Sequence, residues 1–212
     1  MGCLGNPEAP GATTHPLKGM ISIVDAALPS FFIASNHTNM KITEAVQQKI
    51  LVLDGAMGTM IQAYKFQEED YRGNRFASYP HSLKGNNDLL VLTQSEAIDA
   101  IHLAYLEAGA DILETNTFNS NSISMEDYHM SDLVVELNKA AVESARRAID
   151  QYRVKGGTEA KYIAGSVGPT NKTASLSPDV NNPGFRAVSF FDFASVISSN
   201  VKRSLRRVWM RC

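Results

Sequence analysis

The sequence has few of the residues that build disulfide frameworks or metal centres. Its 212 residues include two cysteines, Cys3 and Cys212, which lie at opposite ends of the chain. Two such distant cysteines form neither a disulfide framework nor a metal cluster, and so few thiols favour a reducing, cytoplasmic compartment. The five histidines show no HxxxH or HxH spacing, and no CxxC, Walker loop, GxGxxG or GxSxG is present. The sequence therefore gives no support for a dinucleotide-binding or phosphoryl-transfer enzyme.

Net charge and hydropathy give no indication of a nucleic-acid or membrane partner. The formal net charge is −2, which gives no reason to expect nucleic acid or an anionic membrane as a partner. The apolar stretch Met20–Ser35 contains Asp25 and Pro29 and is too short to span a membrane. Five basic residues crowd the last eleven positions and indicate either a solvated helix face or a weak anion-binding tail. They are Lys202, Arg203, Arg206, Arg207 and Arg211.

The chain divides into a leader and one domain. Residues 1–41 contain Gly, Pro, Thr and Asn in no periodic pattern and are predicted to be a flexible, disordered leader, followed by a domain over 42–212. A short helix is expected near Ile42–Lys49. The compact apolar run Ile50–Leu53 is typical of a strand buried on both faces, as in a parallel sheet. Residues 62–92 are polar with scattered aromatics and are predicted to form a long loop.

Two segments have helical periodicity. Thr93-Gln94-Ser95-Glu96 matches a capping box, and Gly109 is placed to end the helix that follows it. A second helix is expected over Asp132–Tyr152. Their apolar stripes are Ile98, Ile101, His102, Tyr105 and Leu106 in the first, and Leu133, Leu137, Ala141, Ala145, Ala148 and Tyr152 in the second. The position of His102 on this stripe indicates a packed core histidine.

Short apolar strands alternate with these helices. Asp111–Glu114 and Tyr162–Val167 are the second and third predicted strands. The order strand, helix, strand, helix, strand predicts an α/β fold with a parallel sheet. The pattern alone leaves both a (β/α)₈ barrel and a doubly wound sheet open.

Each predicted strand runs into a polar cluster. The clusters begin at Asp54-Gly55, at Glu114-Thr115-Asn116-Thr117 and at Ser166-Val167-Gly168. Ligands of parallel α/β folds bind at the carboxyl ends of strands, so all three clusters are expected on one face. The glycines after Asp54 either make a tight turn or let backbone N–H groups approach a small anion. Glu114 is either a ligand contact or part of an internal ion pair.

In this order, these strand-end motifs resemble the homocysteine-binding barrel of cobalamin-dependent methionine synthases. DGAMGT from Asp54 and ETNTF from Glu114 also occur across related homocysteine methyltransferases. DYRGNRF over 70–76, GNNDLLVLTQ over 85–94 and GPTNKT over 168–173 indicate the cobalamin-dependent branch. The alternative of a betaine- or S-methylmethionine-type homocysteine methyltransferase is disfavoured by the GNNDLLVLTQ run. The resemblance covers residues 44–186. It implies a partial (β/α)₈ TIM barrel that comprises about the first three βα units.

The resemblance also implies a chemistry, which is methyl transfer to the thiol of homocysteine. In the family, zinc held by three late cysteines converts the thiol to a nucleophilic thiolate, which accepts a methyl group from methylcobalamin. Separate modules carry the folate and the cobalamin. The residues expected to contact homocysteine or shape its pocket are Asp54, Gly55, Ala56, Met57, Gly58, Thr59, Glu114, Thr115, Asn116, Ser166 and Gly168.

The resemblance ends at Arg186. Residues 187–212 form a divergent basic end in which a helix over 192–210 is expected, and neither a fourth strand nor the late cysteine motifs follow. The zinc ligands are thus absent from this chain, no catalytic residue is assigned, and the isolated chain is predicted to be an inactive fragment. The alternative is a non-catalytic half-barrel protein that binds a partner.

Overall fold

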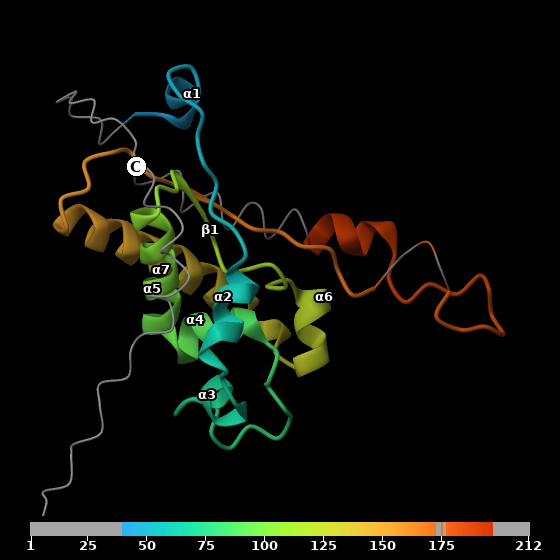
Figure 1. Ribbon diagram of the computed structural model, residues 1–212. Coiled ribbons are helices and arrows are strands. Elements are labelled where there is room, and N and C mark those ends of the chain that lie inside the picture. Colours follow the sequence, from blue (N-terminus) through green and yellow to red (C-terminus); the bar gives the residue numbers. More distant parts are fainter. Residues whose placement is uncertain (1–39, 173–174, 176, 197–212) are drawn as a thin grey trace, which may run out of the picture.

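The computed structural model describes residues 40–172, 175 and 177–196 (Figure 1). Its helices and strands follow the chain as α1 (Ile42–Ala45), α2 (Met57–Tyr64), α3 (Glu68–Arg72), the 3-10 helix η2 (Asn87–Leu89), α4 (Leu90–Thr93), α5 (Ser95–Glu107), β1 (Ile112–Glu114), α6 (Ser122–Met125), the 3-10 helices η3 (Glu126–Tyr128) and η4 (Ser131–Leu133), α7 (Val134–Val154) and β2 (Tyr162–Ala164). The predicted leader lies almost entirely outside the described residues.

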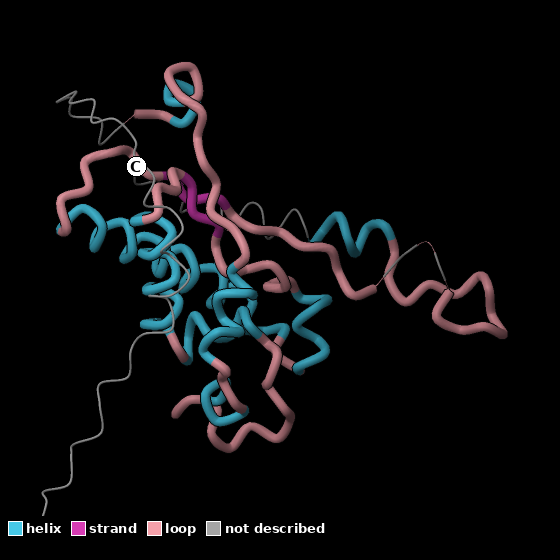
Figure 2. Tube along the Cα trace, in the orientation of Figure 1, coloured by secondary structure: helices cyan, strands magenta, loops and turns pink. Residues whose placement is uncertain are grey.

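The sheet is small and parallel. β1 pairs with β2 in parallel, with Ile112 opposite Tyr162 and Glu114 opposite Ala164. On the other edge of β1, Leu53 forms a single parallel bridge with Ile112. The predicted α/β class and the parallel pairing are therefore confirmed, although both strands are shorter than expected. Figure 2 shows the two strands next to a mainly helical body.

The first predicted strand is the clearest departure. Ile50–Leu53 makes one bridge instead of a strand, and Ile50 is 90% exposed. Val52 and Leu53 are also exposed. A strand is buried on both faces only when further strands or helices cover it, and the described residues leave these three side chains exposed. The expectation of a doubly buried strand is wrong for these residues.

Helices α5 and α7 pack against each other and against one face of the sheet (Figure 1). The predicted stripes supply this contact. Ile98, Ile101 and His102 of α5 are fully buried, as are Leu137, Ala141, Ala145 and Ala148 of α7. The α7 stripe reaches Leu113 of β1, whose side chain points to the helices because side chains alternate along a strand. Ile112 and Glu114 consequently face the other side.

The predicted long loop over 62–92 is wrong, because α3, η2 and α4 lie within it. These helices are too short to show a 3.6-residue periodicity. Side-chain bonds to the backbone hold the connections between them. Glu68 accepts hydrogen bonds from the N–H groups of Leu83 and Lys84, and Arg72 donates to the carbonyl oxygens of Tyr79 and His81.

Two helix boundaries also differ from the predictions. Thr93 ends α4, Gln94 is the N-cap of α5, and no side chain caps that helix. The capping box is therefore not formed. The end of α5 is as predicted, since Gly109 has a φ of +105° after the C-cap. The helix predicted over 192–210 starts at residue 190, and its part after 196 lies outside the described residues.

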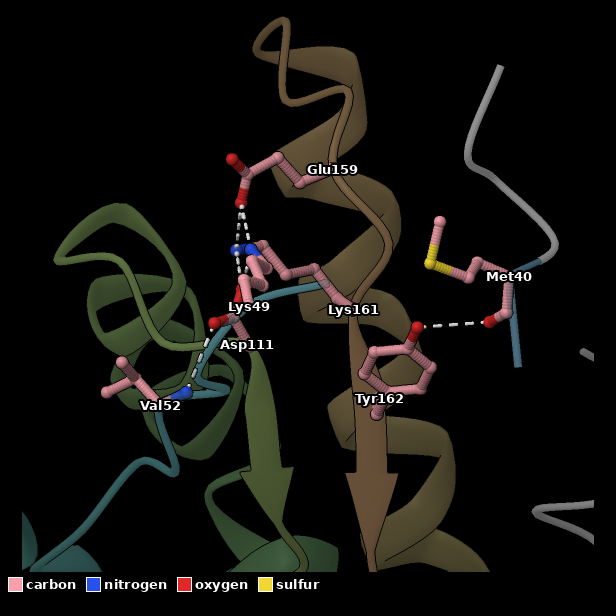
Figure 3. A network of polar contacts seen from close by, with 7 residues as sticks. All are labelled: Met40, Lys49, Val52, Asp111, Glu159, Lys161 and Tyr162. Atoms are coloured by element: carbon pink, nitrogen blue, oxygen red, sulfur yellow. Dashed lines mark hydrogen bonds and ion pairs between the residues drawn. The ribbon is translucent and has the colours of Figure 1, made fainter. Parts of the chain in front are cut away.

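An ion-pair network joins the amino ends of the strands (Figure 3). Asp111 accepts hydrogen bonds from Lys49 Nζ at 2.8 Å, from Lys161 Nζ at 3.3 Å and from Val52 N at 3.1 Å. Glu159 contacts both lysines at 3.3 Å. The Lys161 side chain is only 1% exposed. The network holds the segment before Leu53 against both strands, at the end opposite the polar clusters.

No helix in the described part of the chain is long and apolar enough to cross a membrane.

Candidate functional site

A pocket of about 370 Å³ lies at the carboxyl ends of the strands. It is lined by Asp54, Gly55, Ala56, Met57, Gly58, Asn87, Asp88, Glu114, Thr115, Asn116, Phe118, Asn119 and Ser166. Among the residues predicted from the sequence, all except Thr59 and Gly168 line it. The parallel sheet brings the three polar clusters together here, as the strand-end argument expects.

Asp54 is the most buried part of the first cluster. Its side chain is 3% exposed, and its Oδ1 accepts a hydrogen bond from Glu114 N at 2.9 Å. Burial raises the pKa of Asp54 to about 6, although the hydrogen bond from Glu114 opposes this change. At pH 7 the carboxylate is therefore charged, and it loses its charge as the pH falls through 6.

The amino end of helix α2 forms another wall of the pocket. Ala56 precedes the helix with φ +32°, and no side chain caps the helix. The first backbone N–H groups of a helix have no partner within it and carry a partial positive charge. A Cβ added at Gly55 or Gly58 would meet no atom within 4 Å, so the approach to these N–H groups is open. This geometry favours the anion-binding interpretation of the glycines.

Hydrogen bonds fix the second cluster to the third. Thr115 N donates to Ala164 O at 2.9 Å, Ser166 N donates to Thr115 Oγ1 at 3.1 Å, and Thr117 Oγ1 donates to Ser166 O at 2.8 Å. Thr117 is buried and does not line the pocket, although it holds the wall in place. The wall between the two strand ends is thus held by backbone as well as by side chains.

Four lining residues were not predicted: Asn87, Asp88, Phe118 and Asn119. Asp88 is 2% exposed, and its Oδ2 accepts hydrogen bonds from Asn119 N at 2.7 Å and Ser120 Oγ at 2.9 Å. Burial raises the pKa of Asp88 to about 6, against the effect of these bonds. The sequence signal that was missed is an acid placed directly before the apolar run Leu89–Leu92.

The two predicted residues outside the pocket have different positions. Thr59 lies on the exposed surface of α2. Gly168 packs behind the wall, where its N–H donates to Phe118 O at 3.0 Å. A Cβ on Gly168 would lie 2.6 Å from both the Phe118 ring and Phe118 O. Gly168 therefore shapes the pocket through Phe118.

Gly168→Ala is expected to lower the free energy of unfolding by about 1–3 kcal/mol, because the added methyl group must displace backbone and ring together. Gly58→Ala is the control, since its Cβ meets nothing within 4 Å and alanine favours a helix by about 0.5–1 kcal/mol. Urea denaturation measures both variants. Equal stability of the two variants would show that the close approach at Gly168 is not required.

The homocysteine S-methyltransferase family model matches residues 51–205. The chain belongs to the homocysteine S-methyltransferase family. Similar folds occur in two crystal structures of the homocysteine methyltransferase MmuM from Escherichia coli. The oxidised form has a TM-score of 0.58 at 22% identity and is matched over 79% of this chain and 53% of MmuM. The metallated form has a TM-score of 0.56 at 22% identity, over 76% and 52%. The chain thus spans about half the length of these structures.

The metal that this family resemblance implies does not fit the described residues. Among residues 40–172, 175 and 177–196, no group of three His, Cys, Asp or Glu side chains is arranged to hold a metal ion. Cys3 and Cys212 both lie outside the described part, and two cysteines cannot supply a three-cysteine site.

Proposed function

We propose that the pocket binds the amino-acid end of homocysteine for methyl transfer to its thiol. The observation that carries the proposal is the combination of Asp54, Asp88 and Glu114 with the open amino end of α2 in one pocket. Among the described residues, no lysine or arginine lines the pocket. An α-ammonium group fits beside the carboxylates, and an α-carboxylate fits against the N–H groups of α2.

Glu114 is well suited to contact the ammonium group. It is half-buried, and its carboxylate forms no hydrogen bond or ion pair with the described residues. In Asp54 and Asp88, in contrast, one carboxylate oxygen already accepts hydrogen bonds from protein donors. Glu114 therefore supplies a free acceptor, while the other two carboxylates contribute fixed negative charge.

We further propose that the chain is part of a methionine synthase of the cobalamin-dependent type and forms about the first three βα units of a barrel. The support is the order of the parallel segments, together with two of the sequence runs that indicate this branch. DYRGNRF contains Arg72, which organises the connection after α3, and GNNDLLVLTQ contains Asp88 of the pocket. In such an enzyme the folate and cobalamin modules would be separate from this pocket.

The described residues bind and orient homocysteine, and they do not activate its thiol. A free thiol has a pKa of about 8.5 and stays largely protonated at pH 7. No metal ligand set is formed among the described residues to remove that proton. The chain of residues 1–212 alone is therefore expected to bind homocysteine without forming methionine.

Calorimetric titration with three ligands tests the proposal. Homocysteine is compared with 4-sulfanylbutanoate, which lacks the amino group, and with 3-sulfanylpropan-1-amine, which lacks the carboxylate. Each loss is expected to weaken binding about 10-fold or more, as for a charge-assisted hydrogen bond. Equal affinity for all three ligands would contradict the proposal. Methionine formation by the isolated chain, with methylcobalamin and zinc added, would contradict the predicted inactivity.

A second candidate is a non-catalytic half-barrel that binds a protein partner. The observation that favours it is the open edge at Ile50–Leu53, where Ile50, Val52 and Leu53 are exposed. Exposed edges with apolar side chains can pair with another chain. If the chain forms a stable complex with a protein partner and does not bind homocysteine, this candidate is favoured over the first.

A further inference from the structure

One buried side chain next to the pocket has no visible partner. His102 of α5 is 0% exposed, and neither of its ring nitrogens forms a hydrogen bond with the described residues. A buried N–H without an acceptor is costly, and such groups are rare in folded proteins. Its position on the apolar stripe explains why His102 is buried, but hydrophobic packing alone does not explain a polar ring at this position.

A carboxylate oxygen of Asp54 lies close to the ring of His102. His102 Nδ1 lies 4.0 Å from Asp54 Oδ2. The other carboxylate oxygen, Oδ1, already accepts the bond from Glu114 N, whereas Oδ2 has no donor among the described residues. The unpartnered His102 Nδ1 therefore lies opposite Asp54 Oδ2 across a gap about 1 Å longer than a hydrogen bond. A shift of about 1 Å between the two side chains would bring these atoms within hydrogen-bond distance.

Burial and the neighbouring charges determine the protonation state of His102. Burial lowers the pKa of His102 to about 4, while Asp99 opposes the change and Arg147 adds to it. The ring is therefore neutral at pH 7 and carries one N–H. Asp54 is faced by Glu114 from β1 and by Tyr105 and His102 from α5. The charge of the Glu114 side chain repels the ionised carboxylate of Asp54. The charged state of Asp54 is therefore favoured only by groups that donate a hydrogen bond to it.

We infer that His102 is a positioning residue whose neutral imidazole donates its Nδ1 hydrogen to ionised Asp54 and aims that carboxylate into the pocket. Its consequence for ligand binding rests on the proposed function, in which Asp54 attracts the ammonium group. The hydrogen bond itself is a property of the chain without ligand. The two can therefore be tested separately.

Two substitutions to amide side chains distinguish the role of Nδ1 from that of Nε2 in the His102 ring. The amide nitrogen of His102→Asn overlaps the position of Nδ1, and that of His102→Gln reaches the position of Nε2. Both variants are polar and flexible, so a purely structural role predicts similar effects. His102→Leu removes both nitrogens at similar volume. Circular dichroism and urea denaturation report folding of each full-length chain.

The first readout is the titration of Asp54, followed by ¹³C NMR of its carboxyl carbon and assigned with Asp54→Asn. His102→Asn is expected to leave the titration near that of the wild type. His102→Gln and His102→Leu are expected to raise the pKa of Asp54 by about one unit, which corresponds to a tenfold loss of preference for the charged form. If His102→Leu does not fold, the asparagine and glutamine variants still decide the question.

The second readout is homocysteine affinity from pH 5 to pH 8. In the glutamine and leucine variants the pH at which affinity falls is expected to move up by about one unit, and in the asparagine variant it stays unchanged. Equal titrations for His102→Asn and His102→Gln would overturn the inference. The expected titrations without any homocysteine binding by the wild type would support the hydrogen bond and overturn the proposed ligand.

Discussion

Asp54→Asn is expected to weaken homocysteine binding by about 30-fold or more, because removing one partner of a buried charge pair typically costs about 2–5 kcal/mol. Asparagine keeps an oxygen to accept the hydrogen bond from Glu114 N, so the pocket retains its shape. Titration calorimetry at pH 7.5 measures the change. Asp150→Asn is the matched control, since it removes the same charge from a side chain that is 71% exposed.

The pH dependence of binding follows from the same carboxylate. The pKa of Asp54 is raised to about 6 by burial, so protonation removes the attraction for an ammonium group below that pH. Wild-type affinity is expected to fall about tenfold for each unit below pH 6. The asparagine variant should lack this component of the pH dependence. An unchanged profile in Asp54→Asn would show that another group controls binding.

Asp54→Asn should also make the fold more stable at pH 7, which distinguishes lost binding from lost structure. A carboxyl group whose folded pKa is raised binds protons more readily in the folded state than in the unfolded state. Its contribution to stability is therefore greatest at low pH and decreases as the pH rises from about 3.8 to about 6. Removing the charge relieves this cost, so the urea midpoint at pH 7 should increase.

Asp111→Ala is expected to lower the free energy of unfolding by about 3–5 kcal/mol, because it leaves a buried ammonium group without its principal carboxylate. Among the described residues, the one carboxylate left paired with Lys161, whose side chain is 1% exposed, would be Glu159, which is itself 58% exposed (Figure 3). The control is Glu107→Ala, which breaks an ion pair whose side chains are 44% and 57% exposed. That pair should contribute less than about 1 kcal/mol. Urea denaturation at pH 7 compares the two variants.

The contribution of Asp111 should disappear in acid. Burial alone would raise the pKa of Asp111, but hydrogen bonds from Lys49 and Val52 and the charges of Lys161 and Lys49 outweigh it and lower the pKa. The resulting stability is present above the unfolded pKa of about 3.9 and is lost as the pH falls through the lower folded value. The difference between wild type and Asp111→Ala should therefore narrow at low pH, and a constant difference would exclude the charge as its cause.

The local pattern predicted the elements with long, regular stripes. Most positions of the predicted α5 and α7 stripes are buried, and Gly109 ends α5. A helix of three or more turns repeats its apolar face several times, so its pattern is recognisable in the sequence. The short helices α3 and α4 contain about one turn each and give no such repeat. Their positions depend on side-chain bonds such as those of Glu68 and Arg72, which join residues many positions apart.

The pocket also contains some residues that could be predicted from the sequence and others that could not. Asp54, Glu114 and Ser166 could be assigned to one pocket from sequence, because parallel strands place their carboxyl ends together. Asp88 could not, since it lies in a connection that no periodicity places near the strands. It enters the pocket because Asn119 N and Ser120 Oγ bind its carboxylate from a distant part of the chain.

The α/β alternation, the buried helix faces and the polar strand ends could be predicted without a structure, because each depends on residues close together in the chain. Three features depend instead on how distant segments fold together: the exposure of Ile50–Leu53, the place of Asp88 in the pocket and the approach of His102 to Asp54. Burial, and the polar partners that a buried group requires, depend on segments that meet only when the chain is folded.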